Sequence, residues 1–480
     1  MTFTGVLLIP LCLIIIVMPW RWALVSVLVL SLLASSAVFN LGSFGLQPGY
    51  FFGMLMVGRT AVELAFSGGL LRSALLLRLA PLGALLALSV LLLWVAIIAF
   101  HGKVQVVGGT DSFNLDRAQP YEFRRENITQ ITYLTLNALF VFVIAHQGAK
   151  LGTEALRSCF QTGMVAAIVI SAFVCLWQMA SFYAGVPFAD AFFFSNAGYA
   201  KASGQALFGI LRVNGLFSEP SALAYFYIAF LCFCWSNLQA TPTMRWSLLT
   251  FTCVAMMILS TSTTAFLLLA AFALMSLPDV WRLASRSFPG GGGLTVTGLT
   301  AMAVLLVSLV AGAVMLLQYR YEVDQIFTSM VLEKQDTSSF EQRTGVDRMA
   351  LDIFVETYGL GIGLGSHKPS SLGMTILSNL GAVGSILFLA MIVSAVWPLA
   401  WSGRSSDPRR QGGQPIMRAF CGLVLAHAVS NPNLSYMFFW LLLGYLVGYV
   451  VALDEETAAD GSGQPQSMIL APARAGIPDR

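Results

Sequence analysis

Residues 211–238 read LRVNGLFSEPSALAYFYIAFLCFCWSNL, a short polar loop that runs directly into an apolar stretch. Arg212 and Glu219 lie in the loop, and the stretch from Ala222 to Leu238 contains no charged residue. Because a charged side chain is costly inside a bilayer, this pattern predicts a pair of charges at the mouth of a membrane helix. Pro220 suits the first turn of that helix, and the carboxylate of Glu219 suits its positive end.

The composition of the whole chain agrees with a membrane location. Of its 480 residues, 57% are hydrophobic and only 10% are charged, whereas soluble domains carry roughly 25% charged residues. The net charge of +3 gives no indication of nucleic acid binding. All 7 cysteines fall in apolar runs without metal-ligand spacing, so neither a metal site nor a disulfide is predicted.

Apolar runs long enough to cross a bilayer as helices recur along the chain. At about 20 residues per span, about 12 or 13 spans are expected. They are predicted near residues 3–19, 23–40, 50–67, 81–100, 129–146, 158–183, 222–239, 247–260, 264–278, 295–318, 371–400, 416–430 and 434–452. The prediction is therefore an all-α, polytopic membrane protein with a single transmembrane domain over 1–452. The tail 453–480 is rich in Asp, Glu, Gly, Pro and Ala and is predicted to be disordered.

The distribution of Lys and Arg in short connections predicts the orientation, because these residues accumulate on the cytoplasmic side. One alternating set of connections carries cationic residues, namely Arg21, Arg72, Arg78, Lys150, Arg157, Arg245, Arg282, Arg286, Arg404, Arg409, Arg410 and Arg418. The opposite short connections, 41–49, 260–264 and 431–433, carry none. The first set is therefore predicted to be cytoplasmic, and three long outer loops are predicted at 101–128, 184–221 and 319–370.

The third outer loop contains a recognisable helix signal and a glycine-rich stretch. Thr344 and Asp347 are spaced as in a capping box, which predicts a helix from about 345 to 357. Its apolar residues fall on one face, which is expected to lie on the membrane interface: Val346, Met349, Ala350, Ile353 and Phe354. The glycines that follow, from Gly359 to Gly365, are expected to leave backbone amides open to an anionic ligand.

Three segments of the chain resemble the O-antigen polymerase/ligase superfamily, and in particular the Wzy-type exopolysaccharide polymerases. Arg212-Val-Asn-Gly-Leu-Phe-Ser-Glu219-Pro220 is similar to the R-x-x-G-x-F-x-E-P pattern before a membrane helix. Residues 259–264, LSTSTT, are similar to a short Ser/Thr turn between two closely spaced helices. Arg348 followed by residues 361–367, GIGLGSH, is similar to the end of the large periplasmic loop.

The resemblance implies a GT-C-like membrane glycosyltransferase of the bacterial inner membrane. Its reaction would be an inverting glycosyl transfer, independent of metals and other cofactors, between undecaprenyl-diphosphate-linked oligosaccharides at the periplasmic face. Polymerases of this kind can work with a chain-length regulator protein. The ligase branch usually reads His-Asn or His-Ser, whereas here Lys368 and Pro369 follow His367, which favours polymerase and leaves the ligase as an alternative.

The resemblance also implies roles for individual residues. Arg212 and Arg348 are expected to bind the diphosphate, because the planar guanidinium binds phosphate oxygens bidentately and keeps its charge. Fixed cations of this kind stabilise the negative charge that grows on the leaving group. Glu219 is the candidate general base for the acceptor hydroxyl, with His367 as a residue that shares this task or holds the diphosphate. Further candidates for substrate binding are Arg343, Lys368, Gly363, Gly365 and Ser366.

Structural roles are alternatives for each of these residues. Arg212 and Glu219 can form a salt bridge that closes a loop. Arg348 can pair with Asp352 one helical turn later, and His367 can be a solvated loop residue. Arg59 and Glu63 lie inside an apolar run at i,i+4 spacing, where mutual neutralisation on one helix face is favoured over a functional role.

Two other classes of function are compatible with a polytopic chain. A transporter, such as a flippase for lipid-linked oligosaccharides, is expected to show internal repeats and charges at mid-membrane depth. This chain instead concentrates its charges in outer loops, which favours an enzyme that acts at the outer leaflet. A non-catalytic membrane subunit of a polysaccharide export complex would need no constellation of Arg and Glu.

Overall fold

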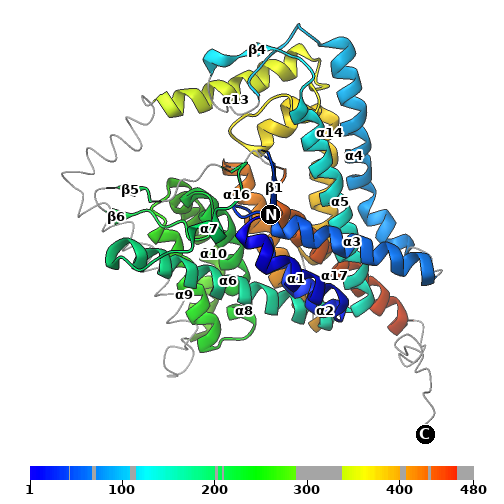
Figure 1. Ribbon diagram of the computed structural model, residues 1–480. Coiled ribbons are helices and arrows are strands. Elements are labelled where there is room, and N and C mark those ends of the chain that lie inside the picture. Colours follow the sequence, from blue (N-terminus) through cyan, green and yellow to red (C-terminus); the bar gives the residue numbers. More distant parts are fainter. Residues whose placement is uncertain are drawn as a thin grey trace.

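The computed structural model describes residues 1–42, 44–67, 72–108, 115–199, 204–207, 210–287, 338–400, 407–430 and 434–461, and it is mostly helical (Figure 1). Six helices in these ranges are long and apolar enough to cross a membrane. They are α4 (Ser73–Ala99), α5 (Arg125–Leu151), α6 (Thr153–Ala184), α8 (Pro220–Ala240), α14 (Leu372–Ala400) and α17 (Met437–Gly461). A mostly helical chain with several possible membrane spans is therefore confirmed.

The remaining elements are shorter. The other α-helices are α1 (Phe3–Val17), α2 (Trp20–Leu30), α3 (Pro48–Ser67), α7 (Asp190–Phe193), α9 (Met244–Leu259), α10 (Thr263–Ser287), α13 (Ser338–Glu356), α15 (Pro408–Gly412) and α16 (Gln414–Ser430). Three antiparallel hairpins pair β1 (Phe39–Leu41) with β2 (Phe44–Leu46), β3 (Gln105–Val106) with β4 (Gln119–Pro120), and β5 (Ala206–Leu207) with β6 (Ile210–Leu211). A 3-10 turn, η1 (Leu115–Arg117), precedes β4.

One predicted helix is shorter than expected, and another lies outside the described residues. The helix predicted over 23–40 ends at Leu30, because the residues that follow bind the second outer loop instead. There the Ser36 hydroxyl donates to Phe193 O at 2.8 Å, and Asn196 N donates to Ser35 O at 3.1 Å. The helix predicted near 295–318 lies outside the described residues.

The centre of the protein is formed by α8 and α17. In the apolar windows of these two helices 94% of the residues are buried, compared with 28% in α4 and 33% in α14. α17 packs most closely on α5, where Gly444 and Gly448 leave room for the neighbouring backbone: a Cβ at Gly448 would lie 3.0 Å from Ala145 Cα. α4 and α14 therefore lie at the periphery, with much of their apolar surface uncovered.

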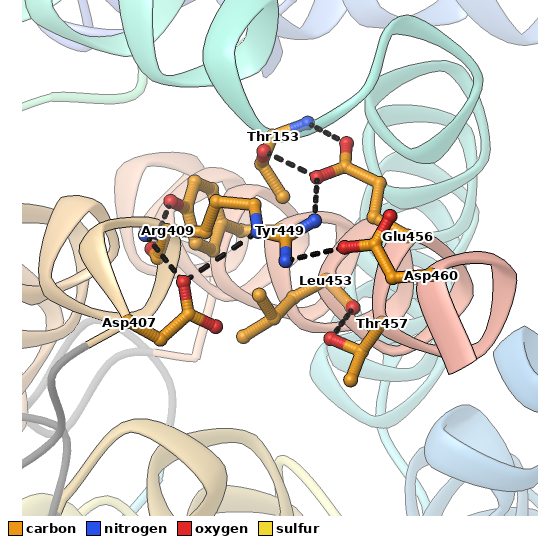
Figure 2. A network of polar contacts seen from close by, with 8 residues as sticks. All are labelled: Thr153, Asp407, Arg409, Tyr449, Leu453, Glu456, Thr457 and Asp460. Carbon is orange, nitrogen blue, oxygen red and sulfur yellow. Dashed lines mark hydrogen bonds and ion pairs between the residues drawn. The ribbon is translucent and has the colours of Figure 1, made fainter. Parts of the chain in front are cut away.

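The end of α17 contradicts the prediction of a disordered tail from residue 453. α17 continues to Gly461, and its acidic residues are paired with the connections predicted to be cytoplasmic (Figure 2). Glu456 accepts hydrogen bonds from Thr153 N and Oγ1, both at 2.8 Å, and Arg409 Nη2 lies 2.7 Å from Asp460 Oδ2. These partners are far away in the sequence, so composition alone could not reveal them; residues 462–480 lie outside the described ranges.

Arg59 and Glu63 form the predicted pair and also join α3 to three other helices. Arg59 Nε lies 3.0 Å from Glu63 Oε1, and Arg59 Nη1 donates to the carbonyls of Ile16 and Met18 at the end of α1, each at 2.6 Å. Trp20 Nε1 donates to Glu63 Oε1 at 2.8 Å. Gln147 Nε2 of α5 donates to Glu63 Oε2 at 3.0 Å. The contacts agree with a structural role, because they join α3 to α1, α2 and α5.

The connections predicted to lie on one side of the membrane also come together in space. The segment 101–108 packs against the end of the third outer loop, and residues 35–40 bind the second. Figure 1 shows α13 and β4 at the opposite end of the molecule from the end of α17. The parts of the first and third predicted outer loops that carry β4 and α13 therefore lie away from the ion pairs around the end of α17.

Candidate functional site

One buried side chain of α6, that of Gln178, holds the loop from Arg212 to Glu219. Gln178 Oε1 accepts hydrogen bonds from Asn214 N at 3.0 Å and from Gly215 N at 2.8 Å, and its Nε2 donates to Asn214 Oδ1 at 2.6 Å. Gly215 has φ +57, and a Cβ there would lie 2.6 Å from Cys175 Sγ. Only glycine fits this position without strain, so the loop is fixed against α6.

Two further contacts fix the rest of the loop. Val213 N donates to Leu259 O at the end of α9, at 3.2 Å. The ring of Phe217 stacks on that of Phe226 with centroids 4.7 Å apart, which ties the loop to α8. The loop that carries the charged pair is thus held by α6, α8 and α9.

Arg212 is half-buried at the base of the β5–β6 hairpin. Its Nη1 donates to Gln205 Oε1 at 3.2 Å, and its backbone N donates to Gln205 O at 2.9 Å. Its Nε is buried and has no hydrogen-bond partner among the described residues. A buried N–H group without a partner is rare and needs an explanation, such as a ligand that is bound there.

Glu219 immediately precedes α8, as predicted, and its side chain is exposed. The carboxylate does not cap the helix but accepts a hydrogen bond from Ser221 Oγ at 2.5 Å. In the part of the chain that the structure describes, no ion pair joins it to Arg212. The salt bridge that would explain both residues structurally is therefore not formed, and the carboxylate is accessible.

Replacing Gln178 by leucine is expected to lower activity strongly while the protein stays folded. Leucine keeps the size of the side chain but leaves the amides of Asn214 and Gly215 without an acceptor, which costs about 1–3 kcal/mol per buried group. Gln161→Leu is the matched control, because Gln161 also lies in α6 and donates to an asparagine of α8, Asn237, at 2.8 Å. Polymer length, the readout of the activity that the resemblance implies, and membrane abundance are measured for both, and equal loss of activity would contradict a specific role of Gln178.

The helix of the third outer loop differs from its prediction. α13 begins at Ser338, so Thr344 and Asp347 lie inside it and form no capping box. Asp347 instead accepts hydrogen bonds from the backbone N of Ser370, at 2.6 Å, and from its hydroxyl. The predicted capping box is wrong because the carboxylate binds a segment 23 residues later in the chain.

The apolar face of α13 is predicted correctly, but its partner is not. Val346, Ala350 and Ile353 are buried, and Ile353 belongs to a cluster made by the first outer loop and the end of α4. The other buried members of this cluster are Ala96, Phe100, Val104, Val106, Tyr121 and Ile362. The face is therefore covered by protein rather than by the membrane interface.

The glycine segment is packed, and most of its amides are already used. Gly363 N donates to Asn379 O at 2.9 Å, and Ser366 N donates to Asn379 Oδ1 at 3.1 Å. A Cβ at Gly365 would lie 2.7 Å from the carbonyl oxygen of Glu126, so close backbone contact explains this glycine. The expectation that the glycine amides are open to an anion is therefore wrong for Gly363, and the amide of Ser366, a candidate for substrate binding, is also bonded to Asn379 of α14.

His367 is buried and has partners on both ring nitrogens. Val107 N donates to Nδ1 at 3.2 Å, and Nε2 lies 3.1 Å from Val346 O, which assigns the neutral tautomer with its proton on Nε2. Burial lowers the pKa of His367 to about 4. The ring therefore joins the first outer loop to α13, and in this arrangement it is available neither as a base nor as a ligand for the diphosphate.

This burial predicts that stability falls as the pH is lowered. The folded state holds His367 neutral, whereas the unfolded chain binds a proton near pH 6.5, so stability is complete above that value and is lost between about pH 6.5 and 4. The full loss is on the order of 3 kcal/mol. The measurement is the thermal midpoint of the purified protein between pH 7 and 5, and His367→Gln should give a flatter curve; equal slopes would contradict the assignment.

The predicted cations of the third outer loop are accessible. Arg343 and Arg348 are exposed on α13, and no ion pair between Arg348 and Asp352 occurs within the described ranges. Lys368 is half-buried, and burial lowers the pKa of its ammonium. No hydrogen bond or ion pair joins Arg212 or Glu219 to Arg348, Lys368 or His367, so the structure does not bring the two predicted halves of the site into contact.

Sequence reasoning missed two residues that support the site, Gln178 and Tyr225. Gln178 is an isolated amide in an apolar helix, which is the kind of signal that predicts a hydrogen bond between helices. Tyr225 of α8 and His427 of α16 are both buried, and the Tyr225 hydroxyl is hydrogen-bonded to His427 Nε2. The ring of Tyr436 lies 5.2 Å from that of Tyr225, so the start of α8 rests on an aromatic cluster.

No protein-family model matches this chain, and no curated protein is significantly similar to it. The resemblance to the polymerase/ligase superfamily therefore depends on the quoted motifs alone. The structure adds the geometry of one loop at the mouth of α8. This loop presents an accessible carboxylate and an arginine whose buried Nε has no partner among the described residues.

Proposed function

We propose that this protein is a membrane glycosyltransferase that polymerises undecaprenyl-diphosphate-linked oligosaccharide repeat units into exopolysaccharide or O-antigen. In this proposal it has a GT-C-like fold and acts at the periplasmic face of a bacterial inner membrane. The observation that carries the proposal is the loop of Arg212 and Glu219. It presents a fixed cation and an accessible carboxylate, without a salt bridge between them, at the start of an apolar helix.

The chemistry of glycosyl transfer needs both groups. The acceptor hydroxyl attacks the anomeric carbon of the donor sugar, and the bond between that carbon and the diphosphate oxygen breaks, with the electron pair leaving on the diphosphate. Glu219 takes the proton of the acceptor hydroxyl. Arg212 stabilises the negative charge that develops on the diphosphate, and this interaction is stronger in the transition state than in the ground state.

The rest of the fold supports a position beside lipid. α4 and α14 are apolar over lengths that suit a membrane and leave much of their apolar surface uncovered, so the polyprenyl tail of a substrate can lie against them in the bilayer. Arg343, Arg348 and Lys368 add cations from the third outer loop. With His367 engaged on both nitrogens, Glu219 is the base that this proposal assigns.

The test is deletion of the protein followed by analysis of the lipid-linked intermediates. A polymerase predicts that the deletion strain accumulates a single repeat unit on the lipid carrier and makes no long polymer. A ligase predicts full-length polymer that stays on the lipid carrier, and a flippase predicts repeat units that remain on the cytoplasmic side. Normal elongation in the deletion strain would exclude the proposed function.

A further inference from the structure

The turn between α9 and α10 contains a residue in a strained conformation. Thr261 has φ +44, in the left-handed region. A β-branched side chain is unfavourable there because its Cβ crowds the following carbonyl oxygen. Tyr358, the other such residue among those described, follows the end of α13 and is 90% exposed. Strain of this kind persists where the surrounding structure imposes it, which is common at binding sites.

The hydroxyl of Thr261 is also unpaired. Its Oγ1 is buried and has no hydrogen-bond partner among the described residues. The hydroxyl of the preceding residue behaves differently: Ser260 Oγ donates to Met257 O at 2.6 Å and accepts from Ser262 N at 3.4 Å. The turn thus holds one buried hydroxyl that has no hydrogen-bond partner in the described part of the chain.

This turn is bonded to the loop that carries Arg212. Leu259 O accepts from Val213 N at 3.2 Å, so Thr261 and Arg212 lie on two neighbouring backbone segments. Arg212 Nε is a second buried polar atom that has no partner among the residues the structure describes. α10 begins at Thr263, so the positive end of a 25-residue helix adds to the same site.

The unpaired groups share one chemical property, since a guanidinium N–H and a hydroxyl can both donate to an oxygen. Glu219 is the only acidic residue within 204–221 and 259–264, and its carboxylate binds Ser221. A site with donors and positive charge fits an oxyanion. A water molecule would satisfy the donors as well but would leave the charge of Arg212 uncompensated.

We propose that Thr261 and Arg212 together bind one oxyanion of the substrate. This inference rests on the proposed function in naming the oxyanion as part of the lipid diphosphate. Thr261 donates its hydroxyl hydrogen to a phosphate oxygen, and Arg212 donates from Nε to the same phosphate group. The strained backbone at Thr261 holds the hydroxyl in place before the ligand arrives, so less ordering is needed on binding.

The test measures the binding of inorganic pyrophosphate to the full-length protein in lipid nanodiscs. Thr261→Val removes the hydroxyl and keeps the shape, and it should weaken binding about tenfold. Thr261→Ser should bind nearly as wild type. Thr261→Gly should raise the thermal midpoint, because glycine relieves the strain, and yet weaken binding as the valine variant does. Thr252→Val is the matched control, since that exposed hydroxyl on α9 donates to Leu248 O at 2.9 Å.

A double-mutant cycle adds a second criterion. If both residues bind one phosphate group, the effects of Arg212→Gln and Thr261→Val on binding should not be additive, whereas independent residues give additive effects. Unchanged binding in Thr261→Val, or no pyrophosphate binding by the wild type, would overturn the inference. Because binding is measured without polymerisation, a deletion strain that elongates normally would exclude the polymerase while the oxyanion site could still stand.

Discussion

Replacing Arg212 by alanine is expected to abolish polymer formation while the protein stays inserted and abundant in the membrane. Removing a fixed charge that faces a developing negative charge lowers rates by about 100- to 1000-fold. Arg212→Lys should restore only part of the activity, because an ammonium is a point charge and lacks the planar fork. The measurement is the length distribution of the polysaccharide, with the abundance of the variant determined in the same membranes.

Glu219→Gln should have an effect of similar size for a different reason. Glutamine keeps the shape of the side chain and still accepts from Ser221, but it cannot take the proton of the acceptor hydroxyl. A general base contributes about 100- to 10,000-fold. The loss should therefore appear in kcat, with pyrophosphate binding unchanged, whereas Arg212→Ala should weaken binding as well.

Matched controls separate these effects from a general loss of charge. Arg245→Ala removes a cation that lies over the ring of Trp246, 5.0 Å from its centroid, at the start of α9. Glu154→Gln removes a carboxylate that pairs with Arg157 at 2.8 Å. Both variants should make polymer of normal length. Normal polymer in Arg212→Ala or in Glu219→Gln would remove that residue from the mechanism.

Gly381→Ala should have the largest effect on stability. Gly381 interrupts α14 with φ +63, and a Cβ there would lie 2.1 Å from Gly359 O and 2.4 Å from Leu360 O. Ala382 N donates to Gly359 O at 2.9 Å, so the clash would also break this hydrogen bond. The free energy of unfolding should fall by about 3 kcal/mol or more, because backbone atoms cannot move aside as a flexible side chain can.

The clash in Gly381→Ala should also loosen the third outer loop, because the backbone at Gly381 packs against the segment that leads to His367 and Lys368. The measurement is the thermal midpoint in detergent together with protease sensitivity of the outer loops. Gly373→Ala is the control within α14: a Cβ there meets nothing within 4 Å, so stability should be unchanged or rise by up to about 1 kcal/mol. Equal midpoints for the two variants would show that the close approach at Gly381 is not needed.

The six long apolar helices of the described residues overlap spans that the sequence predicts, and the reason is local. The apolar run after Pro220 predicts a helix over 222–239, and α8 spans Pro220–Ala240. The run at 371–400 likewise matches α14, although the interruption at Gly381 is visible only in the structure. Backbone hydrogen bonds of a membrane helix are satisfied within the segment itself, so composition and length are sufficient to locate it.

Part of the candidate site was likewise predictable from the sequence, and part of it was visible only in the structure. That Arg212 and Glu219 lie at the mouth of α8 was predictable, because charge is excluded from the apolar run that follows. The residue types of His367, Gly363 and Ser366 did not show that these residues are poor candidates for binding the substrate. Their polar groups are already hydrogen-bonded to Asn379 and Val107. A motif shows which groups are present but not which of them the fold has already used.

The sequence by itself therefore determined that the chain is mostly helical with possible membrane spans. It also determined where the long helices lie and where one pair of charged residues lies. Tertiary structure decided the rest: Gln178 holds the loop, and ion pairs stabilise α17 as far as Gly461. It also decided that Thr261 and Arg212, on adjacent segments, have donors without a partner among the described residues. The physical reason is the range of the interactions. Burial in a bilayer depends on each residue and its close neighbours, whereas hydrogen-bond satisfaction depends on partners up to hundreds of residues away.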